Sequence, residues 1–278
     1  MFGVLFMLSG TLFGELSNAL GKREIKQKKE TVFSMGFLNT FFVVLIFLGI
    51  TLIFPEKFVF SFASLPTLIP RILLEVTQMT FFMFAISKAP RSSFGFLRVL
   101  TIPLLLIVDI ILGYSVSQMQ LIAIAIIVTT LLFLFLNHGI KKKGSIFVLF
   151  TACNAVLTIS LYKYNITNYN SVIAEQLIVL SCILLYFFIS ARLYTKEHPL
   201  RLLKKKLYLF QSVSSGAAHI LESFAYLFAP ASVIMAAKRS STIMWSIISG
   251  RVYFHEKHVL RKFIGFIVIA GALFLLTL

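Results

Sequence analysis

Three cationic side chains interrupt segments that are otherwise apolar, and their types and positions suit the binding of an anion. Lys238 and Arg239 follow Pro230 by eight and nine residues, about 12 Å along a helix that rises 1.5 Å per residue. Arg98 stands at the equivalent place after Pro90. An Arg side chain binds phosphate or carboxylate through two parallel hydrogen bonds, and Lys adds a point charge.

Polar side chains extend the helical face of Lys238. Ser241 and Trp245 follow it by three and seven positions, so all three share one side of a helix and could line a polar cavity. We therefore expect a substrate site made of Arg98, Lys238, Arg239, Ser241 and Trp245. The alternative interpretation is that the cations pair with buried acids and only hold helices together.

Five further polar residues in apolar segments are candidates for coupling or counter-charge. Glu15 and Asn18 share one helical face, as do His219 and Glu222, and Glu175 lies in another apolar segment. An acid beside the cations would be ionised and would neutralise them, whereas an acid alone in a dry site could carry a proton. The sequence leaves these roles, and simple pairing between helices, open.

Arg71 and Glu75 stand four residues apart in a third apolar segment. Oppositely charged side chains at this spacing are neighbours on the surface of a helix. We expect a structural ion pair within that helix.

The sequence lacks the residue patterns that several functional classes of protein need. The five histidines are scattered, and no segment has metal-ligand spacing, a phosphate-binding loop or a nucleophile beside a base. We expect neither an enzyme nor a bound metal or cofactor. The net charge of +16 does not indicate nucleic acid, because the basic residues cluster in loops without interleaved aromatic residues.

The elements that position these residues are membrane-spanning helices. Of the 278 residues 59% are hydrophobic and 13% are charged, with a mean hydropathy of +0.94, and a soluble domain of this size cannot bury so much apolar surface. A spanning helix needs about 20 apolar residues. The apolar runs predict an all-α integral membrane protein with ten spans, near residues 2–20, 31–54, 65–86, 90–112, 117–136, 146–162, 171–193, 206–228, 231–252 and 260–278. Pro103 is expected to kink the fourth.

Basic residues alternate between the loops as ten spans require. Twenty of the 26 Lys and Arg residues fall in loops on one side of the membrane, whereas Lys57 and Lys163 alone fall on the other. Basic loops face the cytoplasm. We therefore expect a multi-pass protein of a bacterial inner or plasma membrane with both termini outside.

The chain repeats its layout after 140 residues. This shift aligns Pro90 with Pro230 and Arg98 with Lys238, each in a helix after an Ala-Pro turn. Halves 1–140 and 141–278 would each hold five spans, and an odd number inverts the second half relative to the first. Inverted repeats are a common plan of secondary transporters.

Residues 229–258, APASVIMAAKRSSTIMWSIISGRVYFHEKH, and the Gly-containing run that follows resemble the last two helices of the EamA-type drug/metabolite transporter superfamily. In that family a helix after Ala-Pro ends near a Glu, and Glu256 occupies this position. The first half departs from the pattern, because Ser115 and Val116 stand where the acid would be. Within the superfamily, Arg98, Lys238 and Arg239 resemble the cations that hold the substrate phosphate in the triose-phosphate and nucleotide-sugar branch.

These observations predict a secondary active transporter that moves a small organic anion, phosphorylated or carboxylated, by alternating access without ATP. Its partners would be this solute, the lipid bilayer and either protons or a counter-substrate. One alternative is a transporter of a cation, amine or amino acid that binds at Glu15 and Glu222. An alternative of another class is a membrane scaffold or receptor that transports nothing.

Overall fold

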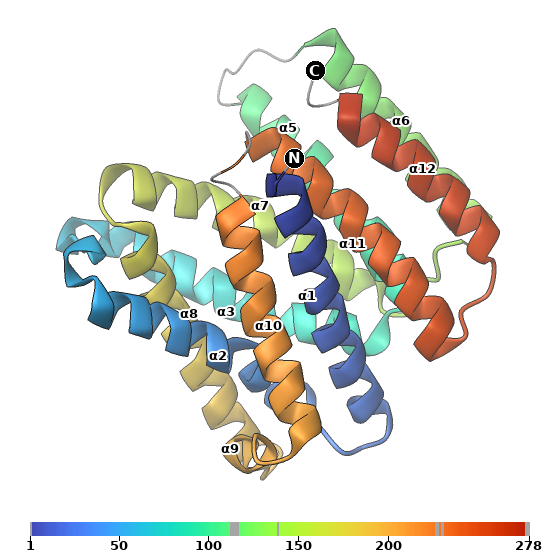
Figure 1. The fold of residues 1–278 in the computed structure, drawn as a ribbon. Coiled ribbons are helices and arrows are strands. Elements are labelled where there is room, and N and C mark those ends of the chain that lie inside the picture. The colour runs from blue at the N-terminus through green and yellow to red at the C-terminus, as the bar shows by residue number, and fades with distance from the viewer. Residues whose placement is uncertain (1, 112–116, 138, 226–227, 229–230, 276–278) are drawn as a thin grey trace.

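The computed structural model describes residues 2–111, 117–137, 139–225, 228 and 231–275, and this part of the chain contains helices and no strands (Figure 1). Ser115, Val116 and Pro230, which the sequence analysis singled out, lie outside the described residues. The helices of the first half are α1 (Phe2–Lys26), α2 (Val32–Ile53), η1 (Pro55–Lys57), η2 (Phe62–Ser64), α3 (Leu65–Lys88), α4 (Arg91–Arg98), α5 (Thr101–Ile111) and α6 (Gln118–Leu136). Those of the second half are α7 (Ser145–Asn168), α8 (Val172–Leu193), α9 (Pro199–Leu202), α10 (Lys206–Ala225), α11 (Ala231–Phe254) and α12 (Val259–Leu275).

Six helical segments in the described residues are long and apolar enough to cross a membrane: Phe2–Lys26, Val32–Ile53, Phe62–Lys88, Gln118–Leu136, Ser145–Asn168 and Val172–Leu193. Large apolar side chains cover their outer faces, including Leu52, Leu73, Leu136 and Leu193. Such a surface is stable in contact with lipid and not with water. The chain is therefore an α-helical protein of the membrane.

The predicted span 90–112 is not one helix. It divides into α4 and α5, with Val99 and Leu100 between them. Pro103 has no N–H to donate to the carbonyl of Val99. The backbone instead forms hydrogen bonds between residues three positions apart, as in a 3₁₀ turn, such as Ile102 N–H to Val99 O at 2.9 Å. This break places Arg98 at the end of a short helix.

Helix packing relates distant parts of the chain. α1 packs against α10 and α11, while α7 packs against α3, α4 and α5; α2 pairs with α8, α4 with α11 and α6 with α12. Figure 1 shows α1 between α10 and α11, and α6 beside α12. The residues that carry chemistry come mainly from α1, α4, α10 and α11.

Two pairs of helices begin at the same spacing. α2 begins at Val32 and α8 at Val172, and α4 begins at Arg91 and α11 at Ala231, which is 140 residues in both cases. The side chains of Thr31 and Ser171 cap α2 and α8 by accepting from the backbone N–H three residues on. The same type of cap therefore starts α2 and α8.

Candidate functional site

Lys238 of α11 forms an ion pair with Glu222 of α10, with 2.7 Å between Nζ and Oε2. The Lys238 side chain is 29% exposed and that of Glu222 is 17% exposed. His219 lies near enough to both for their charges to act on it. Lys238 therefore lies within the helix bundle, and the Glu222 carboxylate is its counter-charge.

Arg98 joins this group from α4. Its guanidinium lies over the rings of Phe82 and Phe94, at 4.9 and 5.6 Å from their centroids. The charges of Arg239 and Glu222 act on it from α11 and α10. The structure thus brings Arg98, Lys238 and Arg239 into one neighbourhood with Glu222, which we call the central cluster.

Ser241 and Trp245 contact α1. Thr11 Oγ1 donates to Ser241 Oγ at 2.9 Å, and Trp245 Nε1 donates to the carbonyl oxygen of Leu8 at 3.1 Å. The indole N–H is satisfied by this bond and is not directed at an open site. Both residues therefore fasten α11 to α1 beside the central cluster.

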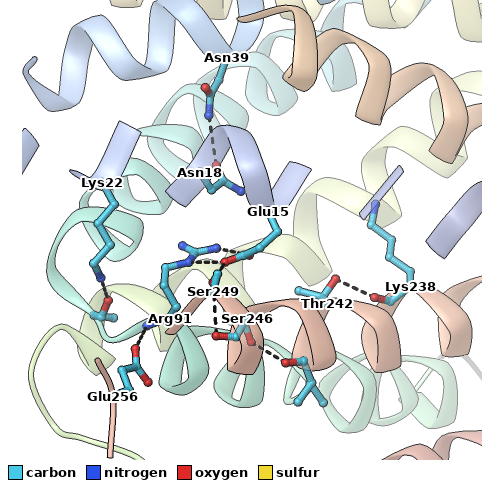
Figure 2. Close-up of polar contacts among 12 residues, drawn as sticks. Glu15, Asn18, Lys22, Asn39, Arg91, Lys238, Thr242, Ser246, Ser249 and Glu256 are labelled. Atoms are coloured by element: carbon cyan, nitrogen blue, oxygen red, sulfur yellow. Dashed lines mark hydrogen bonds and ion pairs between the residues drawn. The ribbon is translucent and has the colours of Figure 1, made fainter. Parts of the chain in front are cut away.

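Glu15 lies in a second network, which contains Arg91, Ser249 and Glu256 (Figure 2). Its carboxylate accepts from Arg91 Nε at 2.8 Å and from Arg91 Nη2 at 2.5 Å, and it also accepts from Ser249 Oγ. Arg91, one of the twenty basic residues that the sequence analysis assigned to loops, is fully buried at the start of α4. Glu15 is its counter-charge.

Glu256 completes this network, which we call the basic-end lock. It accepts from the backbone N–H of Arg91 at 2.6 Å, from Ser92 Oγ and from Lys262 Nζ at 2.9 Å. Burial by itself would raise the pKa of Glu256, but these hydrogen bonds and the Lys262 charge hold it below its ordinary value. Lys22 donates to the carbonyl of Ala89 alongside, so the lock ties α1, α4, α11 and α12 together.

Asn18 takes part in contacts between helices. Asn39 Nδ2 of α2 donates to Asn18 Oδ1 at 3.2 Å, and Ser17 Oγ donates to Asn39 Oδ1 at 3.0 Å. Figure 2 shows Asn18 directed toward Asn39. These bonds connect α1 to α2.

The predicted ion pair between Arg71 and Glu75 is corrected by the structure. Arg71 Nη1 lies 2.5 Å from Oε1 of Glu175 on α8, and both side chains are buried. Asn165 and Asn170 donate to the two carboxylate oxygens at 2.7 and 2.6 Å. Glu175 is the ion-pair partner of Arg71 because these amides also satisfy the remaining lone pairs of its carboxylate. Glu75 interacts instead with Thr158, and the Arg71 charge acts on it from a greater distance.

Glu30, which the sequence analysis did not single out, is buried in the turn before α2. Gln211 Nε2 of α10 donates to Glu30 Oε1 at 3.2 Å, while Glu30 Oε2 and Gln211 Oε1 have no partner. Burial raises the pKa of Glu30 well above its ordinary value; the Gln211 bond opposes this, and the charges of Glu197 and Glu24 add to it.

No group of three His, Cys, Asp or Glu side chains in the described residues could hold a metal ion. No protein-family model and no curated protein sequence matches the chain. Membership of the EamA-type superfamily therefore stays a prediction based on the residues quoted above.

Proposed function

We propose that the chain is a secondary active transporter for a small organic anion, phosphorylated or carboxylated. The observation that carries this proposal is the exposure of the Lys238–Glu222 pair. It is the most exposed of the four ion pairs in the described residues, since no side chain of the other three is more than 9% exposed. An accessible ion pair beside two further cations is the arrangement that a polar solute could reach.

The charge of the central cluster favours an anion. Arg98, Arg239 and Lys238 bring three positive charges together, and Glu222 pairs with Lys238. Cations held together in an apolar bundle repel one another, and a bound phosphate or carboxylate would relieve that repulsion. Arg98 and Arg239 come from α4 and α11, so the anion would bridge the two halves of the chain.

The helix arrangement supports an inverted repeat of ten spans. If each helix is replaced by the helix at the same place in the other half, α1 becomes α7, α10 becomes α3, and α11 becomes α4 with α5. The packing of α1 on α10 and α11 then becomes the packing of α7 on α3, α4 and α5, which the structure also contains. The same exchange also returns each of the pairs α2–α8, α4–α11 and α6–α12 to itself. Such exchange symmetry is the basis of alternating access, because each half can adopt the conformation of the other.

The basic-end lock is evidence for a transport path that is closed at one end. Glu15, Arg91 and Glu256 connect α1, α4 and the loop after α11 through buried ion pairs and hydrogen bonds. In the proposed orientation this end faces the cytoplasm, both termini lie outside, and the membrane is a bacterial inner or plasma membrane. The arrangement then corresponds to a state closed to the cytoplasm.

Ligand-induced thermal stabilisation of the purified protein tests the anion site, because a solute that binds only the folded form raises the unfolding temperature. Phosphorylated sugars, nucleotides and carboxylates should stabilise the wild type. Lys238→Ala or Arg239→Ala should weaken that binding by about tenfold or more, since each removes a charged hydrogen bond worth roughly 1.5–3 kcal/mol. Lys142→Ala, which removes an exposed loop charge, is the control. Equal anion binding by all four proteins would remove the proposal.

Uptake into proteoliposomes separates this function from its alternatives. A transporter of a cation, amine or amino acid would use Glu15 and Glu222, whose carboxylates are engaged by Arg91 and Lys238 in this structure. Competition by anions but not by amines supports the anion proposal, and the reverse supports the alternative. Stabilising ligands without uptake would favour a receptor or scaffold.

A further inference from the structure

An open cleft lies on the surface of the bundle where the last turns of α1 and α11 meet. Its volume is about 420 Å³, and its lining residues are Arg23, Lys26, Gln27, Val252, Tyr253 and Phe254. Two of these side chains are cationic and none is acidic. The cleft therefore favours a negatively charged group.

A smaller, mostly apolar cavity of about 70 Å³ adjoins this cleft. It shares Arg23 and Tyr253 with the cleft, and its other lining residues are Leu16, Ala19, Leu20 and Phe210. Leu16 and Arg23 are seven residues apart on α1, which is about 10 Å along the helix axis. The apolar cavity thus leads from the basic cleft along α1, between α10 and α11.

The surroundings of both cavities are exposed and mostly apolar or aromatic. Phe210, Val252 and Tyr253 are exposed, although they are large and apolar or aromatic. Lys26 and Arg23 lie in the last turn of α1, at the end where its apolar segment meets the basic turn before α2. This position corresponds to the headgroup layer, where amphipathic rings and basic side chains gather.

We propose that these joined cavities bind one anionic phospholipid, with its phosphate between Arg23 and Lys26 and an acyl chain against Leu16, Leu20 and Phe210. The Nζ of Lys26 lies 4.7 Å from the centroid of the Phe254 ring, which holds this cation at the cleft. A soluble phosphate would leave the apolar cavity empty, and a zwitterionic lipid would leave the cations uncompensated. This site lies outside the central cluster and does not depend on transport.

Native mass spectrometry of the full-length protein, purified in detergent and mixed with phosphatidylglycerol or phosphatidylcholine, tests the site. Wild type should retain phosphatidylglycerol in preference to phosphatidylcholine. A basic residue near an anionic headgroup contributes about a fivefold change in affinity, so Arg23→Ala/Lys26→Ala should lose roughly 25-fold. Lys141→Ala/Lys143→Ala removes the same charge from an exposed loop away from the cleft and should keep the preference.

Leu20→Trp tests the apolar half, since the larger ring fills the cavity and leaves both cations in place. It should reduce phosphatidylglycerol retention without creating a preference for phosphatidylcholine. Glycerol 3-phosphate, which has the phosphate and no acyl chain, should not displace the lipid. Equal loss in the cleft and loop variants would overturn the proposal in favour of general surface charge. Displacement by glycerol 3-phosphate, with unchanged binding in Leu20→Trp, would overturn it in favour of a soluble anion.

Discussion

At the scale of single residues, the four ion pairs of the described residues divide into three enclosed pairs and one accessible pair. Arg71 with Glu175, and Arg91 with Glu15, are closed off and supplemented by hydrogen bonds from Asn165, Asn170 and Ser249. Removing one partner of such a pair leaves a buried charge without compensation, which costs more than the intact pair contributes. These pairs are therefore expected to be structural, in contrast to Lys238–Glu222.

The Arg71–Glu175 pair gives a direct test of this distinction. Glu175→Gln should destabilise the protein by about 3–5 kcal/mol, because Arg71 keeps its charge and loses its carboxylate. Glu75→Gln is the matched change on the residue that the sequence proposed as partner, and it should cost less. Unfolding temperatures of the two variants in detergent check the prediction. A larger loss of stability for Glu75→Gln would show that Glu75 on α3, and not Glu175, is the main partner of Arg71.

Glu30 predicts a dependence of stability on pH. Its pKa is higher in the folded protein than in the unfolded chain, because it is buried and near Glu197 and Glu24. Its contribution to stability is therefore complete below the unfolded pKa of about 4.3 and is lost as pH rises through the folded pKa. Glu30→Gln imitates the protonated carboxyl, so its advantage in unfolding temperature over wild type should grow from acidic to alkaline pH.

Glu56→Gln supplies the control for this experiment, because Glu56 is an exposed carboxyl in η1. It should shift the unfolding temperature little at any pH. A Glu30→Gln difference that is constant across pH would show that packing, and not protonation, separates the variant from wild type.

The sequence predicted the interior cations better than it predicted their partners. Lys238 and Arg98 stand out because a charge in an apolar segment is visible in the sequence itself. Glu175 is 104 residues from Arg71, so the pairing exists only once α3 and α8 lie together. Arg91 follows a proline at a segment boundary, which also fits a loop; its burial depends on carboxylates from α1 and the loop after α11.

At the scale of elements, the apolar runs located the helices, and local backbone chemistry set their breaks. The division of α4 from α5 follows from Pro103, whose effect begins four residues earlier at the carbonyl of Val99. Gly95 lies where α4 crosses α11, and a Cβ there would meet Ser246 Oγ and Cβ. Such close approaches depend on the facing helix, so the sequence could locate α4 and not its contact.

Gly144 shows how a loop depends on one residue. Its φ is +76°, and a Cβ there would lie 2.6 Å from the backbone nitrogen of Ala89 in the turn before α4. Gly144→Ala should therefore destabilise the protein by roughly 1–2 kcal/mol from the left-handed conformation alone. Gly49→Ala is the opposite case, since a Cβ there meets nothing within 4 Å in helix α2, and it should stabilise by about 0.5–1 kcal/mol.

Unfolding temperatures of these two variants should therefore move in opposite directions. A loss in both would mean that any added methyl group disturbs the bundle. A neutral result for Gly144→Ala would mean that the α6–α7 loop moves away from Ala89 at little cost.

At the scale of the whole molecule, the basic and apolar features divide the bundle into zones. The basic-end lock, the Glu30 turn and the proposed lipid cleft involve residues near the C-terminal end of α1, whereas Arg71 and Glu175 lie in the N-terminal turns of α3 and α8. Lys238 of the central cluster lies 11 residues before Ser249 of the lock on α11, which is about 16 Å along the helix axis. In the proposed transporter, substrate access and release would occur at opposite ends, and the lock would close the end at which α1 finishes.

Sidedness supplies the strongest test of this arrangement, because α4 and α5 are separately too short to span a membrane. Within the described residues they contain 8 and 11 residues, so they cross only if they act together as one broken span. Lys57 and Lys142 are separated by α3, by α4 with α5, and by α6. Three crossings place them on opposite sides, whereas a re-entrant α4–α5 would place them on the same side.

Lys57→Cys and Lys142→Cys, each in a background with Cys153 and Cys182 replaced by Ala, distinguish these topologies. A membrane-impermeant maleimide added to intact cells should label Lys57→Cys and not Lys142→Cys, because the excess of basic loops on the Lys142 side directs it to the cytoplasm. Inverted vesicles should give the reverse pattern. Labelling of both positions from one side would break the proposed inversion of the halves, since the first half would then contain an even number of crossings and Arg98 would no longer be related to Lys238 by an inverted repeat.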